Sequence, residues 1–488
     1  MQRRAGWVII GVLVTAAVVF GLTRDRGTRS TPGASEHAGP PSFVIIVMDT
    51  ARRDRLSCYG YERETSPRLD ELAATSTLFT NAHSTSSWTS PAHASLFTGL
   101  YPASHEVTQE HWKMNDDLTT LAEILGGNGY RTIGIIENPI LSSEYGFQQG
   151  FSEYYFTGRM QRAVDRAGGG RSETGNLATD RFLKSIREFD DDTPYFIFVN
   201  LIAPHQPYDS SKQFMDTFVT DETQNITSNM WPEYYLGEKR FTPSELRHLN
   251  ELYDAEILYT DHLVGLMMDG LRDQDLRDET VFIVTSDHGE NIGDHEHMDH
   301  VFSLYRTTTT VPLIVSAPGR LPEGASDDRP VSLVDIFPTV LDMAGIDRGS
   351  HPNQGLSLTS DVVGPDRAML SEYYFPEQAF GRYDPEDRES ERLDPYRRRI
   401  RSLTAGDMKL VWGSDGTHEV YDLSVDPKEE TNLLERGLGS DTLERLERVL
   451  METVDLLEDE SEVEPVSAAT EELSEETKES LRSLGYIQ

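Results

Sequence analysis

Phe43-Val-Ile-Ile-Val-Met-Asp49 decides the fold: six apolar residues follow one another without alternation, and a carboxylate ends the run. Unbroken apolar runs of this length are typical of strands buried on both faces. Helical patterns follow, and the clearest begins at Thr242, where Thr-Pro-Ser-Glu245 supplies an N-cap, a first-turn proline and a capping box and predicts a helix to about Leu271. We therefore predict an α/β domain with a mixed, mostly parallel sheet and helices on both faces. The other runs that predict buried strands lie at 132–136, 195–201, 281–285 and 311–316.

The pattern changes near residue 360. Residues 382–401 are dense in charged side chains and are predicted to form a surface excursion. Residues 402–423 alternate apolar and polar positions, which predicts a small antiparallel sheet. We expect an amphipathic acidic helix from Asp441 to about Glu460 and a short helix from Glu475 to Leu484. The predicted units are a catalytic domain at 43–360, a C-terminal subdomain at 361–437 and an acidic helical tail at 438–488.

A targeting segment precedes the domain. Arg3 and Arg4 come before an almost uninterrupted apolar run from Ala5 to Leu22, whose length at about 1.5 Å per residue nearly matches the hydrocarbon layer of about 30 Å. We predict that residues 1–28 form an uncleaved signal anchor in the cell membrane. A linker at 29–42 then places the catalytic domain outside the cytoplasm. The alternative is a cleaved signal peptide, which would make the protein secreted or periplasmic.

The composition excludes several classes of protein. The formal net charge is −39, whereas a protein that binds nucleic acid needs a basic surface for the phosphate backbone. Cys58 is the single cysteine, so an intramolecular disulfide and a cysteine-based zinc site are both excluded. An apolar content of 37% is sufficient for a packed core. The sequence gives no indication of the oligomeric state.

Three segments carry side chains suited to catalysis. Asp49 ends the first strand, Thr89 lies in a predicted Thr-Ser-Pro turn, and Asp287 and His288 follow a later strand. Each alone has an ordinary explanation, because an aspartate after a strand is more often a cap or turn residue. Together, two carboxylates, an imidazole and an alcohol oxygen form a plausible ligand set for one divalent cation. Such a cation lowers the pKa of a neighbouring alcohol and screens an anionic ester, so Thr89 is a candidate nucleophile.

Six stretches resemble motifs of one known family. They are Asp49-Thr-Ala-Arg-Arg-Asp-Arg-Leu-Ser-Cys-Tyr-Gly-Tyr61, Pro91-Ala-His-Ala-Ser-Leu-Phe-Thr-Gly-Leu-Tyr-Pro102, Asn200-Leu-Ile-Ala-Pro-His-Gln-Pro-Tyr208, Ser286-Asp-His-Gly-Glu290, Val311-Pro-Leu-Ile-Val315 and Tyr421-Asp-Leu-Ser-Val-Asp-Pro-Lys-Glu-Glu-Thr-Asn-Leu433. In this order they resemble the sulfatase family of the alkaline phosphatase superfamily over residues 43 to about 435. The resemblance implies an alkaline-phosphatase-like fold with a small C-terminal antiparallel sheet. It also implies a metal-dependent hydrolase of sulfuric or phosphoric esters.

The nucleophile position departs from the family pattern. Sulfatases oxidise a Cys or Ser in a Cys/Ser-x-Pro-x-Arg context to formylglycine, whereas this chain has Thr89-Ser-Pro-Ala-His93. Threonine cannot yield that aldehyde because its β-carbon already bears a methyl group, so no formylglycine is expected. A sulfated threonine lacks the route by which a formylglycine hydrate expels sulfate, but a threonine phosphate can be attacked in line by water or an alcohol. Here the chain is similar to phosphoglycerol and phosphoethanolamine transferases and to phosphonate monoester hydrolases, so phosphoester or phosphonate substrates are favoured over sulfate.

The resemblance also implies a metal site. Its ligands carry over to Asp49, Thr89, Asp287 and His288, and the expected cofactor is one divalent metal ion. Thr50 stands where many sulfatases have a second acid, so the site has one oxygen ligand fewer. The imidazole of His288 favours Mn²⁺ or Zn²⁺, while Ca²⁺ or Mg²⁺ remains possible.

Further roles follow by position in the family. His205, framed by two prolines, is expected to bind an ester oxygen or protonate the leaving group, and His300 is expected to contact the anionic group. For both, a purely structural histidine is the alternative. His93 replaces an arginine and is expected to keep part of its role in orienting the nucleophile. Asn138 could line the pocket, although an Asn-Pro turn is the favoured explanation.

A second zinc site is conceivable on paper from Asp294, His295 and His297, but a solvated acidic loop is the favoured interpretation. The leading prediction is a metal-dependent ester hydrolase that acts through a covalent Thr89 intermediate. Its expected substrate is an anionic ester of a glycan, a lipid head group or a small molecule. Two alternatives stay open: a membrane-anchored transferase that passes a phospho group to an alcohol, and a non-catalytic relative that binds an anionic glycan.

Overall fold

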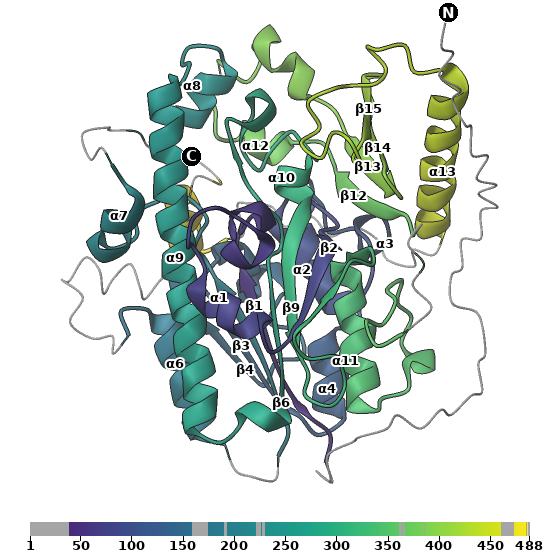
Figure 1. Cartoon of the computed structure of the whole chain (residues 1–488). Helices are drawn as coiled ribbons and strands as arrows, with labels where there is room; N and C mark the ends of the chain where they lie inside the picture. The colour runs from purple at the N-terminus through teal and green to yellow at the C-terminus, as the bar shows by residue number, and fades with distance from the viewer. Residues whose placement is uncertain are drawn as a thin grey trace, which may run out of the picture.

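The computed structural model describes residues 39–158, 174–189, 193–220, 226, 230–360, 364, 367–384, 386–459, 473–484 and 486. Its centre is a nine-stranded sheet with the order β10-β2-β9-β6-β1-β5-β3-β4, in which β11 also pairs with β2 (Figure 1). β9 runs antiparallel to β2 and β6, whereas the other described pairings of this sheet are parallel. The predicted mixed, mostly parallel sheet is therefore confirmed.

The strands of the large sheet include all five apolar runs predicted as buried strands. Strand β2, which precedes the candidate nucleophile, is an addition to that prediction, since its sequence mixes polar and apolar residues. The strands are β1 Ser42–Met48, β2 Thr77–His83, β3 Arg131–Ile136, β4 Glu153–Phe156, β5 Tyr195–Leu201, β6 Thr280–Thr285, β9 Thr310–Ser316, β10 Ala325–Asp327 and β11 Val331–Ser332. A short hairpin pairs β7 Asn291–Ile292 with β8 Met298–Asp299.

Helices cover the sheet on both faces. The longest, α9, begins with the predicted capping box: the Thr242 hydroxyl accepts from the N–H of Glu245, and the Glu245 carboxylate accepts from the N–H of Thr242. The helices are α1 Pro67–Ala73, α2 Thr89–Thr98, α3 Pro102–His105, α4 Leu121–Gly127, α6 Leu177–Arg187, α7 Lys212–Phe218, α8 Trp231–Tyr235, α9 Pro243–Asp273, α10 Arg306–Thr309, α11 Ile336–Ala344, α12 Glu377–Phe380, α13 Ser440–Asp459 and α14 Glu475–Ser483.

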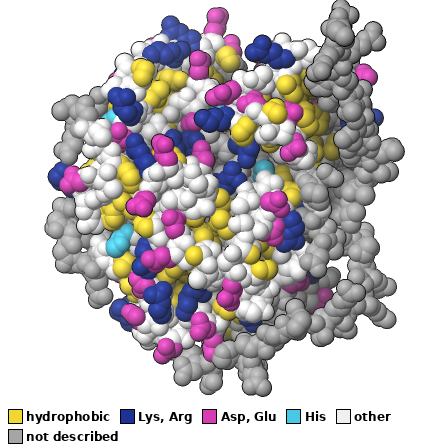
Figure 2. Space-filling view, viewed as in Figure 1, with side chains coloured by type: hydrophobic (Ala, Val, Ile, Leu, Met, Phe, Trp, Pro, Cys, Tyr) yellow, Lys and Arg dark blue, Asp and Glu magenta, His cyan; other side chains and the backbone are white. Residues whose placement is uncertain are grey.

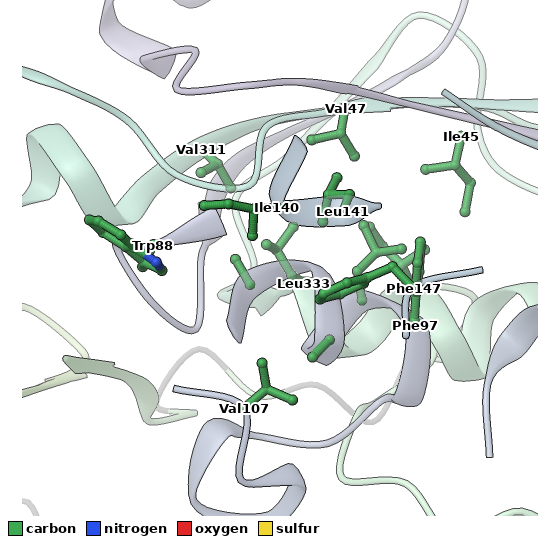
Figure 3. Close-up of a cluster of buried hydrophobic side chains, with 14 of the residues drawn as sticks. Ile45, Val47, Trp88, Phe97, Val107, Ile140, Leu141, Phe147, Val311 and Leu333 are labelled. Atoms are coloured by element: carbon green, nitrogen blue, oxygen red, sulfur yellow. The ribbon is translucent and has the colours of Figure 1, made fainter. Parts of the chain in front are cut away.

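Strand β1 shows how one sequence run serves two cores. Ile45 and Val47 belong to a hydrophobic core that also includes residues of α2, α4 and α11, and Figure 3 shows part of it around Phe97 and Phe147. Ile46 belongs to a second core, formed with residues of α1, α6 and α9. Because both faces are buried, every position from Phe43 to Met48 is apolar. Full burial of each such side chain contributes about 1.5–3 kcal/mol, so the strand end that carries Asp49 is firmly placed.

The C-terminal subdomain contains the predicted antiparallel sheet. Its order is β12-β13-β14-β15, and it lies beside α13 at the upper right of Figure 1. A buried lysine attaches it to the large domain, since Nζ of Lys409 donates to the carbonyl of Leu304 at 2.7 Å. Oε1 of Glu429, in the same subdomain, lies 2.5 Å from that nitrogen and balances its charge. The strands are β12 Met369–Tyr373, β13 Ile400–Ala405, β14 Met408–Gly413 and β15 His418–Asp422. Strand β12 starts before the residues predicted for this sheet.

On the face shown in Figure 2, acidic and basic side chains lie interspersed. Among the residues that the structure describes, no helix combines the length and apolarity needed to cross a membrane. The predicted signal anchor at 1–28 lies outside the described residues, and so does most of the linker predicted at 29–42.

Candidate active site

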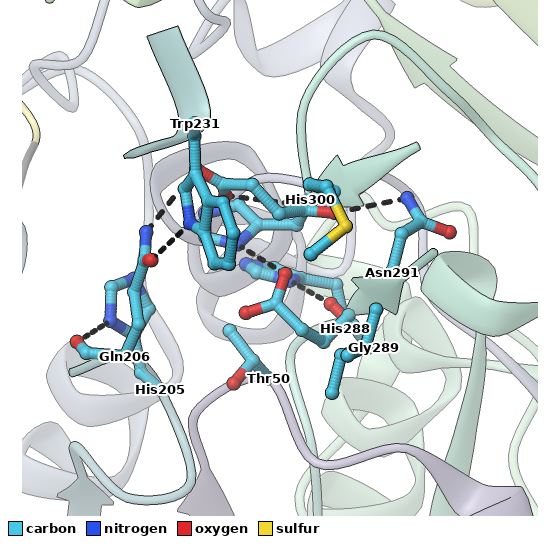
Figure 4. A network of polar contacts seen from close by, with 12 residues as sticks. Thr50, His205, Gln206, Trp231, His288, Gly289, Asn291 and His300 are labelled. Carbon is cyan, nitrogen blue, oxygen red and sulfur yellow. Dashed lines mark hydrogen bonds and ion pairs between the residues drawn. The ribbon is translucent and has the colours of Figure 1, made fainter. Parts of the chain in front are cut away.

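Neighbouring parallel strands bring the candidate residues to one edge of the sheet. Asp49 follows β1, Asn138 follows β3, His205 follows β5, and Asp287 and His288 follow β6. These strands are adjacent in the order β6-β1-β5-β3, and the carboxyl ends of parallel strands meet at the same edge. Figure 4 shows His205 and His288 within a network of polar contacts that also includes His300.

Asp49, Asp287 and His288 form a group that can hold a metal ion, with candidate ligand atoms within 4.8 Å of one another. Oδ1 of Asp49 and Oδ2 of Asp287 are buried and accept no hydrogen bond from any described residue. Nδ1 of His288 donates to the carbonyl of Gly289 at 3.0 Å, and Nε2 lies 3.4 Å from Oδ2 of Asp287. A histidine whose outer N–H is fixed by a carbonyl is typical of metal ligation. The donor set therefore fits a divalent cation.

The electrostatics of this group also favour a cation. Burial raises the pKa of Asp49 well above its ordinary value, and the charge of Asp287 raises it further. Burial also raises the pKa of Asp287 and lowers that of His288, so the imidazole is neutral. Two buried carboxylates beside a neutral ring are costly when both are ionised, and a divalent cation offsets that cost. Asn138 donates to Oδ2 of Asp49 at 2.8 Å, which leaves Oδ1 available.

The turn after β1 has an uncommon backbone conformation. Thr50 has a φ of 62°, in the left-handed region that β-branched residues rarely adopt, and its N–H donates to Oδ1 of Asp287 at 3.1 Å. Tyr253 of α9 clamps this turn. Its hydroxyl donates to the carbonyl of Thr50 at 2.7 Å and accepts from the N–H of Arg52 at 2.9 Å. The long helix thereby fixes the metal-site turn to the second core.

Thr89 is the first residue of α2, so the prediction of a turn at this position is wrong. The residue is fully buried, and its Oγ1 lies 3.4 Å from Nε2 of His288. The positive end of the helix dipole lies at Thr89 and favours negative charge there. His93, one turn later, donates from Nδ1 to the Thr89 carbonyl at 2.9 Å, and the same nitrogen lies 3.6 Å from Oδ2 of Asp287. These contacts give His93 a physical means of orienting the nucleophile.

His300 carries a buried positive charge. Its Nδ1 lies 2.8 Å from Oδ1 of Asp299 and 3.4 Å from Oε1 of Glu290. Burial disfavours the charged ring, but the charges of Asp299 and Glu290 outweigh burial and raise the pKa of His300 to about 10. The His300 ring stands 4.5 Å from that of His288, next to the candidate metal site. Glu290, Asp299 and His300 form a second group that could hold a metal by position, but the pairing of Asp299 with Arg382 favours an ion-paired imidazolium.

His205 is placed on the opposite side of His300, with ring centroids 5.2 Å apart. Its Nδ1 donates to the carbonyl of Gln206 at 2.6 Å, so Nε2 is the acceptor. Burial, followed by the nearby charge of His300, lowers the pKa of His205 to about 3. In this arrangement the ring is neutral, and it accepts a hydrogen bond from the hydroxyl of Tyr486 at 3.1 Å.

Sequence reasoning missed two residues of the site. Arg382 is predicted to lie in a surface excursion, but its side chain is only 10% exposed and pairs with Asp299, because a buried carboxylate needs a cation. The prediction of a surface position is therefore wrong for this residue. Tyr486, near the C-terminus, contacts Thr89 and Asn138. Asn138 combines both of its predicted interpretations, since its Oδ1 caps the turn at Ile140 while its Nδ2 binds Asp49.

Two other candidates stay outside the site. Asp294 pairs with Arg52, and His295 stacks on Tyr305, so the conceivable second zinc site of Asp294, His295 and His297 is not assembled. Cys58 is half-buried, and burial raises the pKa of its thiol to about 12, so it lacks the character of a nucleophile.

Comparisons with known proteins identify the family. The profile described as "Sulfatase" matches residues 41–346, and the profile described as "N-sulphoglucosamine sulphohydrolase, C-terminal" matches residues 293–459. The chain is 24% identical to an arylsulfatase of Clostridium perfringens over 85% of this chain and 94% of that protein. It is 23% identical to the uncharacterized sulfatase YidJ of Escherichia coli over 86% of this chain and 88% of that protein.

Solved structures show the same fold. The phosphonate monoester hydrolase of Agrobacterium radiobacter superimposes with a TM-score of 0.69 at 21% identity, covering 86% of this chain and 96% of that one. The family profile spans more than half of the chain, and the predicted enzyme class agrees with it. The chain therefore belongs to the sulfatase family and is a sulfatase-family hydrolase.

Proposed function

We propose that this protein hydrolyses anionic phosphate or phosphonate esters, in preference to sulfate esters, through a covalent intermediate on Thr89. One observation carries the proposal: an unmodified threonine hydroxyl begins α2 and lies 3.4 Å from His288, beside two carboxylates with unpartnered oxygens. The phosphonate monoester hydrolase among the structural neighbours supports a phosphorus ester. The arylsulfatase among the relatives makes sulfate esters the alternative to be tested.

The metal site belongs to the proposal as well. Asp49, Asp287 and His288 would hold one divalent cation, and the hydroxyl of Thr89 is close enough to complete the set. When bound, such a cation neutralises the ester charge and lowers the pKa of the alcohol. The neutral imidazole of His288 favours Mn²⁺ or Zn²⁺ over an ion that prefers oxygen ligands alone.

The chain's own residues supply the remaining steps. His300 holds a positive charge that binds the anionic ester, because Asp299 and Glu290 keep its ring protonated. As Oγ1 of Thr89 bonds to phosphorus, its proton passes to Nε2 of His205, which carries none beforehand, and the bond from phosphorus to the leaving-group oxygen breaks. His205 then gives that proton to the leaving-group oxygen. Water then attacks the threonine ester at phosphorus, which releases the phosphate or phosphonate and restores the hydroxyl.

A comparison of four substrates tests this proposal. The full chain is assayed with added Mn²⁺ or Zn²⁺ on 4-nitrophenyl sulfate, 4-nitrophenyl phosphate, bis-(4-nitrophenyl) phosphate and a phenylphosphonate ester. We expect the phosphorus esters to be preferred. Thr89→Ala should abolish turnover with the bound metal retained, whereas Thr89→Ser, which keeps the hydroxyl, should retain part of the activity.

Mass spectrometry of acid-quenched enzyme provides the second readout. A mass increase equal to one phosphoryl or phosphonyl group on the peptide that contains Thr89 supports the covalent step. Full activity in Thr89→Ala would disprove the mechanism. A clear preference for the sulfate ester would show that a plain threonine serves sulfate transfer and would overturn the phosphorus preference.

A further inference from the structure

Tyr486, which follows the last described helix, lies inside the active site. Tyr486 follows α14 and is fully buried. Its hydroxyl lies 3.4 Å from Oγ1 of Thr89, accepts from Nδ2 of Asn138 at 3.0 Å and donates to Nε2 of His205 at 3.1 Å. The phenol oxygen therefore contacts the proposed nucleophile and the residue proposed to bind the leaving-group oxygen.

The ring of Tyr486 occupies an aromatic slot. Its centroid lies 5.7 Å from that of Trp88, 6.2 Å from that of Trp112 and 5.5 Å from that of His205, and the first two contacts are edge-to-face. The guanidinium carbon of Arg382 stands 5.9 Å from the ring. These are favourable geometries for a flat ring, which explains why a tyrosine enters a site rich in polar groups.

A substrate and this tyrosine cannot occupy the site together. Attack by Thr89 requires the ester to approach within about 3–3.5 Å of Oγ1, and the phenol oxygen of Tyr486 already stands 3.4 Å away. In addition, Thr89, His93 and His288 are each fully buried in this arrangement. The structure thus describes a closed form, which has to open before the reaction.

The contacts that hold α14 in place lie mostly outside the catalytic residues. Ser474 donates to Glu144 from its N–H at 3.0 Å and from its hydroxyl at 2.7 Å, and Thr477 donates to the same carboxylate at 2.7 Å. Leu481 adds a fully buried apolar contact. Because Ser474 and its hydrogen bonds to Glu144 are exposed to water, they are individually weak, and the attachment can open reversibly.

We propose that residues 473–484 and Tyr486 act as an intramolecular ligand that closes the active site, with Tyr486 in the slot that receives the leaving group of the substrate. The tail then competes with substrate, and the slot accepts a phenol or a similarly flat ring. The proposal rests on the proposed function for the identity of Thr89 as nucleophile. It predicts an apparent substrate affinity reduced by the fraction of open molecules, so a tail closed nine-tenths of the time raises KM about tenfold.

Kinetics of four variants in the full chain test the competition. Tyr486→Ala empties the slot, and Glu144→Ala loosens the tail without touching the slot. Both should lower KM for bis-(4-nitrophenyl) phosphate, by about tenfold and by a smaller factor respectively, and Glu144→Ala should leave kcat unchanged. Glu475→Ala is the matched control, because exposed Glu475 lies on the same helix and its described hydrogen bond is to Lys478 only. An unchanged KM in both Tyr486→Ala and Glu144→Ala would overturn the proposal. A lower kcat in Tyr486→Phe would also overturn it, because the Tyr486 hydroxyl would then take part in catalysis.

Hydrogen exchange gives a readout that needs no turnover. Amides of 475–484 should exchange faster when 4-nitrophenol is added, because it competes for the slot, and should already exchange fast in Tyr486→Ala. If 4-nitrophenol speeds exchange in the tail but turnover does not depend on Thr89, the proposed function alone is refuted. If turnover depends on Thr89 but 4-nitrophenol leaves exchange in the tail unchanged, the proposal of an intramolecular ligand alone is refuted. Glu144→Ala keeps this test available if Tyr486→Ala fails to fold.

Discussion

Asp299→Asn tests whether the active site depends on a permanent positive charge at His300. The ordinary pKa of a histidine is about 6.5, whereas Asp299 and Glu290, acting against burial, raise that of His300 to about 10. This difference corresponds to about 5 kcal/mol in favour of the protonated ring. Asn keeps the shape of the side chain and removes its charge, so the substitution changes the electrostatics of His300 and of its neighbour Arg382 with little change of shape.

The expected effect follows from the protonated fraction. At pH 8 a ring with a pKa of about 10 is about 99% protonated, and one that has returned to about 6.5 is only about 3% protonated. In the parent protein the His300 ring stays charged until the pH reaches its raised pKa of about 10. A variant with a lower His300 pKa loses this charge at lower pH. We therefore expect kcat/KM of Asp299→Asn to fall at pH 8 by up to about 30-fold and to recover below about pH 6.

The assay is the ratio of kcat/KM between variant and parent from about pH 6 to about pH 9.5, since the ratio cancels titrations that both proteins share. Glu290→Gln is the matched variant. It removes the weaker of the two carboxylate contributions, so its alkaline limb should lie between those of the parent and of Asp299→Asn. Two results would refute the reasoning that these carboxylates act through the charge of His300. One is a kcat/KM reduced by the same factor at every pH, and the other is an alkaline decline of kcat/KM at the same pH in the parent and both variants.

Three further changes test the metal site and the fold. Lowering the pH should weaken Mn²⁺ binding, because protons compete for Asp49 and Asp287, whose pKa values are raised by burial; isothermal titration across acidic pH checks this, and constant affinity would contradict it. Tyr253→Phe removes both hydrogen bonds from Tyr253 to the turn after β1. It should lower the unfolding free energy by about 1–3 kcal/mol, measured by urea unfolding, and metal affinity by about tenfold, measured by titration. An unchanged metal affinity would show that Tyr253 does not position the metal site. Glu429→Gln leaves buried Lys409 without its countercharge and should lower the unfolding free energy by about 3–5 kcal/mol, and a loss below about 1 kcal/mol would show that the pair is solvated.

The parts of this fold that follow from local sequence were predictable. Strand β1 and its partners are largely apolar runs because both of their faces are buried. The capping box of α9 is recognisable from four consecutive residues. Parallel strands share one catalytic edge, so Asp49, Asp287 and His288 could be placed together before their distances were known. For these elements, the local pattern and the tertiary environment agree.

The residues that sequence reasoning missed depend on contacts across the chain. The start of α2 carries no capping signal, since its N-cap is Trp88 without a side-chain cap, and Thr89 was therefore placed in a turn. Arg382 looks like one more charge in a charged segment until its pairing with Asp299 is seen. Tyr486 is about 400 residues from Thr89 in sequence, and no spacing rule connects them. Only the folded chain shows that Tyr486 and Arg382 belong to the site.

The left-handed turn at Thr50 has a consequence for protein engineering. A β-branched residue in this conformation costs about 1–3 kcal/mol, which glycine would relieve at the expense of about 0.5–1 kcal/mol of extra chain entropy. Thr50→Gly is thus an easily found thermostabilising substitution. Glycine would also make the backbone at residue 50 more flexible, and the N–H that donates to Asp287 would be held less firmly. The gain in melting temperature would therefore come with a less rigid metal site. A directed-evolution campaign that selects for heat resistance alone would drift toward an inactive protein at this position.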